Sequence, residues 1–347
     1  MNRPPIFIVG SPRSGTNLLR RMLDRHPCIG ICGETHFFST VYPERRRRAF
    51  GELGDVRNRR RLVDELVSTR RIQTLGLDSQ QLAEQLMQEG ESYRALFAAL
   101  CKNYSASQGK ARWGEKTPQH AFFSETLCDW YPGAVIVHML RDPRDVVSSL
   151  LRLPFGFASA ILNARTWLNC NLAARSSKDR PGYLEVRYES LAARPKQELE
   201  RICAFIGEDY SPAMLEAEQS SVTDALETER YLAPVTKERL ERWRKELTAD
   251  QVAQVEWWIG AELENFGYRA AGPPASAATI ARGLARAAFE LGKEIVPMLP
   301  ALWYYYAAPT NLRDWEYWRH PFLRDYVNPE VTVLRDHRGG TPRRSAG

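Results

Sequence analysis

The sequence of 347 residues predicts an α/β protein in which helices cover both faces of a central parallel sheet. Short apolar runs alternate with longer segments of helical pattern, an order that is typical of parallel strands joined by crossover helices. The apolar runs are continuous rather than alternating, as expected of strands that are buried on both faces. With 44% apolar and 26% charged residues, the composition is ordinary for a globular protein with a full core.

Four strands and one long helical insertion are expected along the chain. The insertion covers about residues 44–108, which are rich in charge and carry no strand signal. The strands are expected at Ile6–Gly10, Ile29–Cys32, Ala134–Leu140 and Tyr183–Arg187.

Capping residues, prolines and glycines mark the helix boundaries. A proline follows a capping residue at Thr117-Pro118 and at Asp142-Pro143, which predicts that a helix begins at each pair. A further helix is expected over Pro195–Phe205 and is ended by Gly207. A capping box predicts another over Thr248–Asn265.

The chain is expected to form one domain over residues 1–270, followed by a C-terminal extension over residues 271–347. The segment Gly272-Pro273-Pro274 marks the boundary. After Thr279 the pattern predicts an amphipathic helix, then an aromatic-rich stretch and a disordered Gly/Arg tail. The sequence leaves open three partners for the apolar face of this helix: its own domain, a second subunit of a homo-oligomer, or a membrane surface.

Charge and cysteine usage limit the class of partner and the compartment. The net charge of +6 favours an anionic partner but is too small to indicate a nucleic acid. Six cysteines without a CxxC pair or zinc spacing predict a reduced chain with no metal site. No signal-like segment precedes Ile6 and no run of about 18 apolar residues occurs, so a cytoplasmic protein without a transmembrane segment is expected.

The strongest motif is a phosphate-binding loop between the first strand and the helix that follows it. A strand, a tight loop and a helix N-terminus in this order bind anions through backbone N–H groups and the helix dipole. Gly10 and Gly15 have the spacing of a Walker A loop, which predicts a P-loop NTPase-like three-layer fold. The residues expected to contact the anion are Arg13, Ser14, Gly15, Thr16, Asn17 and Leu18.

The loop lacks the two residues that a nucleoside triphosphatase needs. Thr16 and Asn17 stand where a Walker A loop has a lysine for the β- and γ-phosphates and a hydroxyl residue for magnesium. Metal-assisted ATP chemistry is therefore disfavoured. Arg13 instead offers a bidentate donor to a phosphate or sulfate group.

A second anion site is expected at the end of the strand that closes with Leu140. Arg141 follows at once, and Pro143 fixes the start of the next helix, so Arg141 lies beside the positive end of a helix dipole. Two separate phosphate sites are what a 3′,5′-bisphosphorylated nucleotide requires, whereas ATP would leave one of them empty.

The loop sequence Pro12-Arg13-Ser-Gly-Thr-Asn-Leu-Leu19 resembles the 5′-phosphosulfate-binding loop of sulfotransferases that use 3′-phosphoadenosine 5′-phosphosulfate (PAPS). The segment Cys32-Gly-Glu-Thr35 is similar to the tyrosylprotein sulfotransferase branch and its bacterial relatives. The resemblance covers about residues 5–270. It implies PAPS as donor, 3′,5′-adenosine bisphosphate as product and no metal. It also implies that Arg141 and Ser149 hold the 3′-phosphate.

Sulfuryl transfer needs a base for the acceptor hydroxyl and cations around the leaving oxygen. The resemblance implies that Glu34 is the base and that Lys116, together with Arg13, stabilises the leaving group. His36 is a rival base. It stands where the tyrosylprotein pattern has an arginine, so the sequence does not establish recognition of an acidic peptide.

Two further positions complete the nucleotide site that the resemblance implies. Tyr188 matches a tyrosine near the adenine, and Lys237 falls in the segment that closes over the cofactor. Ala233 stands where the family commonly has a lysine, so the group that covers the sulfate is left open.

Three functions are compatible with these motifs. The leading hypothesis is a sulfotransferase acting on an acceptor hydroxyl of a small molecule, lipid, sugar or peptide. A nucleotide kinase with a degenerate loop would need the lysine and hydroxyl that are absent after Gly15. A non-catalytic nucleotide-binding module would have no use for the combination of Glu34 and Lys116 with the phosphate-binding residues.

Overall fold

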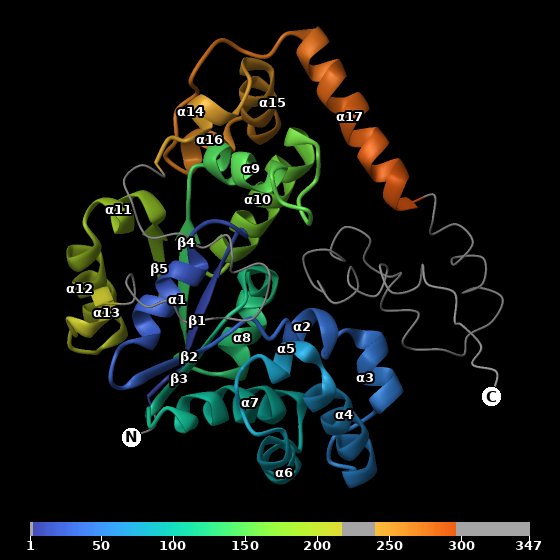
Figure 1. Ribbon diagram of the computed structural model, residues 1–347, viewed down its shortest axis with the longest axis vertical. Helices are drawn as coiled ribbons and strands as arrows, with labels where there is room; N and C mark the ends of the chain where they lie inside the picture. The colour runs from blue at the N-terminus through green and yellow to red at the C-terminus, as the bar shows by residue number, and fades with distance from the viewer. Residues whose placement is uncertain (1–2, 217–239, 296–347) are drawn as a thin grey trace, which may run out of the picture. The chain divides into compact units, whose positions relative to one another are not determined.

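The computed structural model describes residues 3–216 and 240–295 and shows a five-stranded parallel sheet (Figure 1). The strand order is β2-β3-β1-β4-β5, and every neighbouring pair is parallel. The predicted α/β class with a central parallel sheet is therefore confirmed. The strands are β1 (Ile6–Gly10), β2 (Ile29–Cys32), β3 (Arg112–Lys116), β4 (Val135–Leu140) and β5 (Tyr183–Arg187).

Strand β3 was not predicted, because its sequence Arg-Trp-Gly-Glu-Lys lacks an apolar run. All five of its residues are nevertheless buried. Its charged side chains are neutralised by partners elsewhere in the chain: Arg112 Nη1 lies 3.0 Å from Glu208, and Lys116 pairs with Glu34. A charged strand can occupy the centre of a sheet only where such partners exist.

The side chains of β1 alternate between two separate apolar clusters, as the pleat of a strand requires. Phe7 and Val9 belong to one cluster, and Ile6 and Ile8 belong to the other. Helices α1 (Thr16–Asp24), α11 (Tyr188–Ala193) and α12 (Pro195–Ile206) cover the second cluster, while α7 (Tyr93–Ser107) and α8 (Ser124–Trp130) cover the first (Figure 1). This arrangement confirms the predicted three-layer fold.

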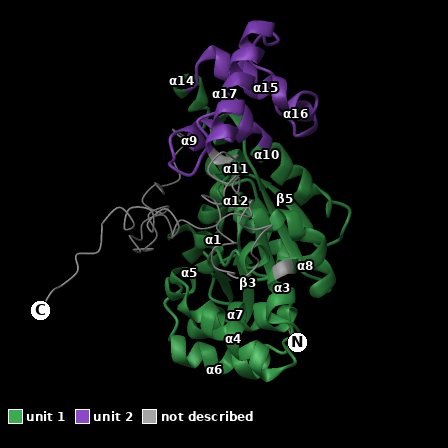
Figure 2. Cartoon of the chain, turned by 90° about the vertical axis from the view of Figure 1, so that its right-hand side faces the viewer, with its two compact units in different colours: residues 1–146, 166–246 green, residues 147–165, 247–347 purple. Residues whose placement is uncertain are grey.

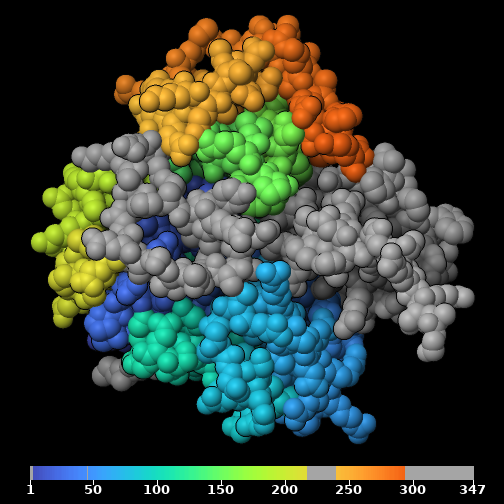
Figure 3. All heavy atoms as spheres, viewed as in Figure 1, coloured from blue at the N-terminus to red at the C-terminus, as the bar shows by residue number. Residues whose placement is uncertain are grey.

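The insertion predicted over about residues 44–108 is helical, and the series of helices runs from Phe37 to Ser107. The helices that precede α7 form one continuous area of the surface of the first unit, coloured blue to cyan in Figure 3. They are α2 (Phe37–Thr40), α3 (Glu44–Phe50), α4 (Val56–Ser68), α5 (Arg70–Gln73) and α6 (Ser79–Glu89).

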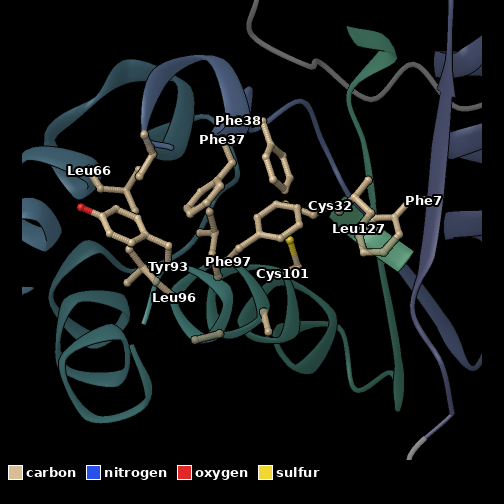
Figure 4. Close-up of a cluster of buried hydrophobic side chains, with 14 of the residues drawn as sticks. Phe7, Cys32, Phe37, Phe38, Leu66, Tyr93, Leu96, Phe97, Cys101 and Leu127 are labelled. Atoms are coloured by element: carbon tan, nitrogen blue, oxygen red, sulfur yellow. The ribbon is translucent and has the colours of Figure 1, made fainter. Parts of the chain in front are cut away.

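An aromatic cluster attaches these helices to the sheet (Figure 4). Phe97 of α7 lies at its centre, with its ring centroid 4.8 Å from that of Phe37, 5.6 Å from Phe38 and 6.1 Å from Phe7. The cluster therefore fixes the chain immediately after β2, where Phe37 and Phe38 directly follow the predicted site residues.

The helix boundaries agree with the predictions at three places and differ at two. The helix expected over Thr248–Asn265 is wrong in its length, because it ends at Ile259, where Gly260 takes a positive φ, and a separate short helix covers Glu262–Asn265. Gly207 ends α12 in a left-handed conformation, Thr248 forms a complete capping box, and Asp142 accepts a hydrogen bond of 2.9 Å from Arg144 N. The predicted cap at Thr117 is wrong, because its hydroxyl makes no cap hydrogen bond. It donates to the Glu115 carboxylate at 2.5 Å, and the helix that follows, η1 (Pro118–Phe123), is a 3₁₀ helix.

The chain divides into two compact units, which Figure 2 shows in different colours. The first comprises residues 1–146 and 166–246 and includes the whole sheet, α13 (Ala213–Glu216) and α14 (Trp243–Glu246). The second comprises residues 147–165 and 247–347. The boundary falls within α9 (Pro143–Leu151) and α10 (Ala160–Arg175).

In the second unit, α17 (Ala277–Ile295) packs on α15 (Ala249–Ile259), and α16 (Glu262–Asn265) follows α15. Gly283 allows the close approach of α17, since a Cβ there would lie 2.7 Å from side-chain atoms of Gln254 and Ile161. The apolar side chains of Leu284 and Phe289 are exposed. The domain boundary at residue 270 stays a prediction. So do the packing of the C-terminal helix on a second subunit and its contact with a membrane surface. The predicted aromatic stretch and Gly/Arg tail lie outside the described residues.

Within the described ranges, none of the helices combines the length and the apolar character needed to cross a membrane.

We expect Phe97→Ala to lower the free energy of unfolding by about 3–5 kcal/mol, because it removes a buried ring from the aromatic cluster. Urea unfolding followed by circular dichroism measures this change. Phe122→Ala is the matched control: its side chain is 49% exposed, so we expect a change within about 0.5 kcal/mol. Equal effects of the two substitutions would contradict the assignment of Phe97 to the core.

Candidate active site

The predicted site residues meet at the edge of the sheet where all five parallel strands end. Ligands bind at this edge in open α/β sheets. The strand order places Glu34 after β2, Lys116 at the end of β3, Arg13 in the loop after β1, Arg141 after β4 and Tyr188 after β5. The edge therefore carries, in spatial order, a carboxylate, a buried lysine, the phosphate loop, a second cation and an aromatic ring.

The loop after β1 has a backbone that ordinary residues rarely adopt. Gly15 precedes α1 with a φ of 93°, and a Cβ there would lie 2.5 Å from the ring of Tyr188. Arg13 also has a positive φ, 70°, which is unusual for a residue with a side chain. Such conformations persist only where the surroundings impose them, and they occur often at binding sites.

The polar atoms of this loop point to an anionic ligand. The Ser14 hydroxyl, which can donate to an anion, is buried, and no described residue supplies its Oγ with a hydrogen-bond partner. Thr16, Asn17 and Leu18 form the first turn of α1, whose N–H groups have no partner within a helix. The positive end of the helix dipole adds to these donors, so the loop fits a phosphate.

Arg141 joins the two predicted anion sites. Its Nη1 donates to the carbonyl oxygen of Arg13 at 3.3 Å, and its guanidinium lies over the Tyr188 ring, 4.2 Å from the ring centroid. The indole of Trp167 donates to the Arg141 carbonyl oxygen at 2.9 Å. Asp145, one turn along α9, lies 3.6 Å from the guanidinium. These contacts fix Arg141 beside the loop and give that edge a buried positive charge.

Glu34, Lys116 and His36 form a connected group on the other side of the loop. Lys116 Nζ lies 2.5 Å from Glu34 Oε1, and His36 Nε2 lies 2.9 Å from Glu34 Oε2. The lysine side chain is 2% exposed and that of His36 is fully buried, whereas that of Glu34 is 30% exposed. Of the three, Glu34 is the group that an acceptor can reach.

The charges of this group follow from their contacts. Burial favours neutral Glu34, but the charge of Lys116 and the hydrogen bond from His36 outweigh it and hold the pKa of Glu34 well below its usual range. Burial lowers the pKa of Lys116, and the charge of Glu34 offsets part of that effect. Burial, together with the charge of Arg71, lowers the pKa of His36 to about 4. At neutral pH His36 is therefore uncharged and donates through Nε2–H.

Three residues beside Glu34 were missed in the sequence. Arg71 of α5 donates to the Glu34 carbonyl oxygen at 3.3 Å, so the insertion contributes a cation to the site. Glu115 and His120 are buried and contact each other at 2.9 Å. The sequence signal for this pair was the polar segment Glu115–His120 itself, in which only Lys116 and a helix start at Thr117-Pro118 were recognised.

Two predicted nucleotide contacts are not placed beside the others. Ser149 lies on α9 in the part of the chain that belongs to the second unit, so its role at the 3′-phosphate stays a prediction. Lys237 and Ala233 lie outside the described residues.

Known proteins share this sequence pattern. Protein-tyrosine sulfotransferase 2 of Gallus gallus is 29% identical over 281 residues, which cover 76% of this chain and 69% of that protein. Nodulation protein NoeE of Sinorhizobium fredii is 26% identical over 288 residues, 74% of this chain but only 64% of NoeE. The solved sulfotransferase domain of the Synechococcus PCC 7002 olefin synthase is 23% identical, with a TM-score of 0.49 over 75% of this chain and 96% of that domain.

The family assignment rests on the part of the chain that contains the whole sheet. Residues 4–212, more than half of the chain, match the family described as the Sulfotransferase family. The match includes the phosphate loop, Glu34, Lys116, Arg141 and Tyr188. The resemblance drawn from the loop sequence is confirmed, and this chain belongs to the sulfotransferase family.

Proposed function

We propose that this sulfotransferase moves a sulfuryl group from PAPS to an acceptor hydroxyl without a metal ion, with Glu34 as the base. The observation that carries the proposal is the contact of 2.5 Å between Glu34 and Lys116 at the sheet edge. It joins a reachable carboxylate to a buried cation beside a phosphate loop that lacks the Walker lysine. Such a site can deprotonate a hydroxyl and stabilise a leaving anion.

The residues divide the binding of PAPS between two positions. The phosphate loop, with Arg13, would hold the 5′-phosphosulfate, and Arg141 with Ser149 would hold the 3′-phosphate. Tyr188 would lie near the adenine, and Lys237 would belong to the segment that closes over the nucleotide. When bound, PAPS supplies the sulfuryl group and a bisphosphate leaving group. The buried Ser14 hydroxyl, whose oxygen has no partner among the described residues, supports the first position.

During transfer, Glu34 would take the hydroxyl proton while the acceptor oxygen bonds to sulfur and the sulfur–phosphate oxygen bond breaks. Lys116 and Arg13 would stabilise the negative charge that develops on the leaving oxygen. Lys116 can serve both groups, because its Nζ already lies beside Glu34 at the edge between β2 and β1.

Glu34 is a better candidate for the base than His36. The His36 side chain is fully buried, and its Nε2 is occupied by the hydrogen bond to Glu34. His36 is then an orienting donor to Glu34.

The proposed acceptor is a molecule that bears a hydroxyl group. Relatives include proteins named protein-tyrosine sulfotransferases, so a tyrosine peptide is the first acceptor to test. All six cysteines are free. This supports, as a further part of the proposal, a cytoplasmic location.

The donor site predicts metal-free binding of 3′,5′-adenosine bisphosphate. In isothermal titration calorimetry with EDTA, we expect the bisphosphate to bind more tightly than ATP-magnesium. Arg13→Ala and Arg141→Ala should each weaken binding about tenfold to hundredfold, because each removes a charged hydrogen-bond donor. Arg180→Ala is the control, since Arg180 pairs with Asp129 at the surface and should leave the Kd unchanged. Tight ATP-magnesium binding without bisphosphate binding would favour the kinase.

The base assignment predicts a loss of turnover without a loss of binding. With labelled PAPS and a phenolic or tyrosine-peptide acceptor, Glu34→Gln should lower kcat by about 10²–10⁴-fold while the bisphosphate Kd stays within about twofold. His36→Gln should retain most activity, because the glutamine amide can still donate to Glu34. A larger loss for His36→Gln than for Glu34→Gln would make His36 the base. Bisphosphate binding without any turnover in the wild-type chain would favour the non-catalytic module.

The ion pair predicts how the protonation of Glu34 depends on Lys116. Because the Lys116 charge lowers the pKa of Glu34, Lys116→Met should raise that pKa. In an acid titration, Glu34 would then become protonated at a higher pH than in the wild type. Carbon-13 NMR of the Glu34 carboxyl in a pH titration measures the change. Lys110→Met, which removes the partner of Asp24, should leave Glu34 unaffected. An unchanged Glu34 titration in Lys116→Met would contradict the ion pair.

A further inference from the structure

The carboxylate of Glu115 lies inside the protein, directly before Lys116 in β3, and its side chain is 1% exposed. Its Oε1 accepts hydrogen bonds from Thr35 N at 3.1 Å, from Thr35 Oγ1 at 2.9 Å and from Thr117 Oγ1 at 2.5 Å. Its Oε2 accepts from His120 Nδ1 at 2.9 Å. One buried side chain thus accepts hydrogen bonds from four donors on three residues, Thr35, Thr117 and His120.

Two of these donors continue the contacts into the turn that carries Glu34. His36 N donates to Thr117 Oγ1 at 3.3 Å, and Phe37 N donates to Thr35 Oγ1 at 3.3 Å. His36 has a φ of 48°, a left-handed conformation that costs energy in a residue with a side chain. The hydrogen bonds that begin at Glu115 hold the turn in this conformation.

The geometry connects this turn to the reacting groups. Glu34 precedes Thr35, and Lys116 lies between Glu115 and Thr117, so the same hydrogen bonds fix the backbone on both sides of the Glu34–Lys116 contact. Cys32 of β2 pairs with Glu115 of β3, which places the two chain segments side by side. A shift of the turn would move the Glu34 carboxylate relative to Lys116.

We propose that Glu115 is a positioning residue for sulfuryl transfer: through Thr35, Thr117 and His120 it sets the place of the Glu34 carboxylate against Lys116. The inference rests on the proposed role of Glu34 as base. Glu115 itself is enclosed by its four donors and does not touch the reacting groups.

Two substitutions of Glu115 separate the effect of its side-chain length from the effect of its negative charge. Glu115→Asp keeps the charge but withdraws the carboxylate by one methylene, so it cannot bind all four donors. Glu115→Gln keeps the reach, and its amide oxygen can still accept from Thr35 and Thr117. The matched control is Glu208→Asp, because Glu208 is an equally buried carboxylate that pairs with Arg112 at the opposite end of the same strand.

The experiment combines kinetics with an NMR titration of the His36 imidazole. We expect Glu115→Asp to lower kcat about tenfold to hundredfold, since a displacement near 1 Å can cost that much. The KM for PAPS and the bisphosphate Kd should stay within about twofold. Glu115→Gln should restore most of the kcat. Burial lowers the pKa of His36 to about 4, so we expect the His36 titration midpoint to move toward the ordinary histidine value in Glu115→Asp as the turn relaxes.

The outcomes distinguish this inference from the proposed function. Wild-type kcat and an unchanged His36 midpoint in Glu115→Asp, with a loss of stability like that of Glu208→Asp, would overturn the inference. An unchanged midpoint with equal losses of kcat for Glu115→Asp and Glu115→Gln would overturn it too. Suppose that the wild-type chain transfers no sulfuryl group but Glu115→Asp shifts the titration midpoint of His36. The proposed function would then fail, whereas the inference that Glu115 positions the turn would hold.

Discussion

The site depends on the position of β3 between β2 and β1. Parallel pairing in the register Cys32 with Glu115 and Ile8 with Lys116 brings the ends of three strands to one edge. Glu34 lies two residues beyond Cys32, just after the strand that pairs with the strand of Lys116, and the phosphate loop begins two residues beyond Ile8. Glu34, Lys116 and the loop after β1 become neighbours because backbone hydrogen bonds pair their three strands. A rigid sheet therefore supplies most of the precision that catalysis needs.

Burial of the charged residues of β3 costs electrostatic free energy, and oppositely charged partners offset this cost. Burying a lysine at the end of a central strand removes its hydration, and its charge is tolerable only beside a carboxylate. Buried ion pairs of this kind add little net stability. The pair of Glu34 and Lys116 is thus better explained by what it does at the edge than by what it adds to folding. Asp145 balances Arg141 in a similar way at the other end of the site.

Sequence reasoning found the parts of the site that local patterns mark. The loop from Gly10 to Gly15 was found because glycine spacing and a flanking strand define it, and Arg141 because a buried apolar run precedes it. Lys116 was found through the family resemblance, but its strand was missed because Arg112, Glu115 and Lys116 hide the apolar character of β3. The roles of Glu115 and His120 depend on partners about 80 residues away in the chain, such as Thr35, and no local pattern reports such contacts.

The low pKa of Glu34 has a consequence for when the base can act. A carboxylate held by Lys116 has little affinity for a proton, so Glu34 is a weak base while the pair is closed. In the proposed mechanism, an anion bound at the neighbouring phosphate loop would compete with Glu34 for the charge of Lys116. His36 stays neutral and keeps its hydrogen bond, so it holds the Glu34 carboxylate in place without neutralising it. Glu34 would then gain basicity as the donor site fills, which makes deprotonation of the acceptor depend on the presence of the sulfuryl donor.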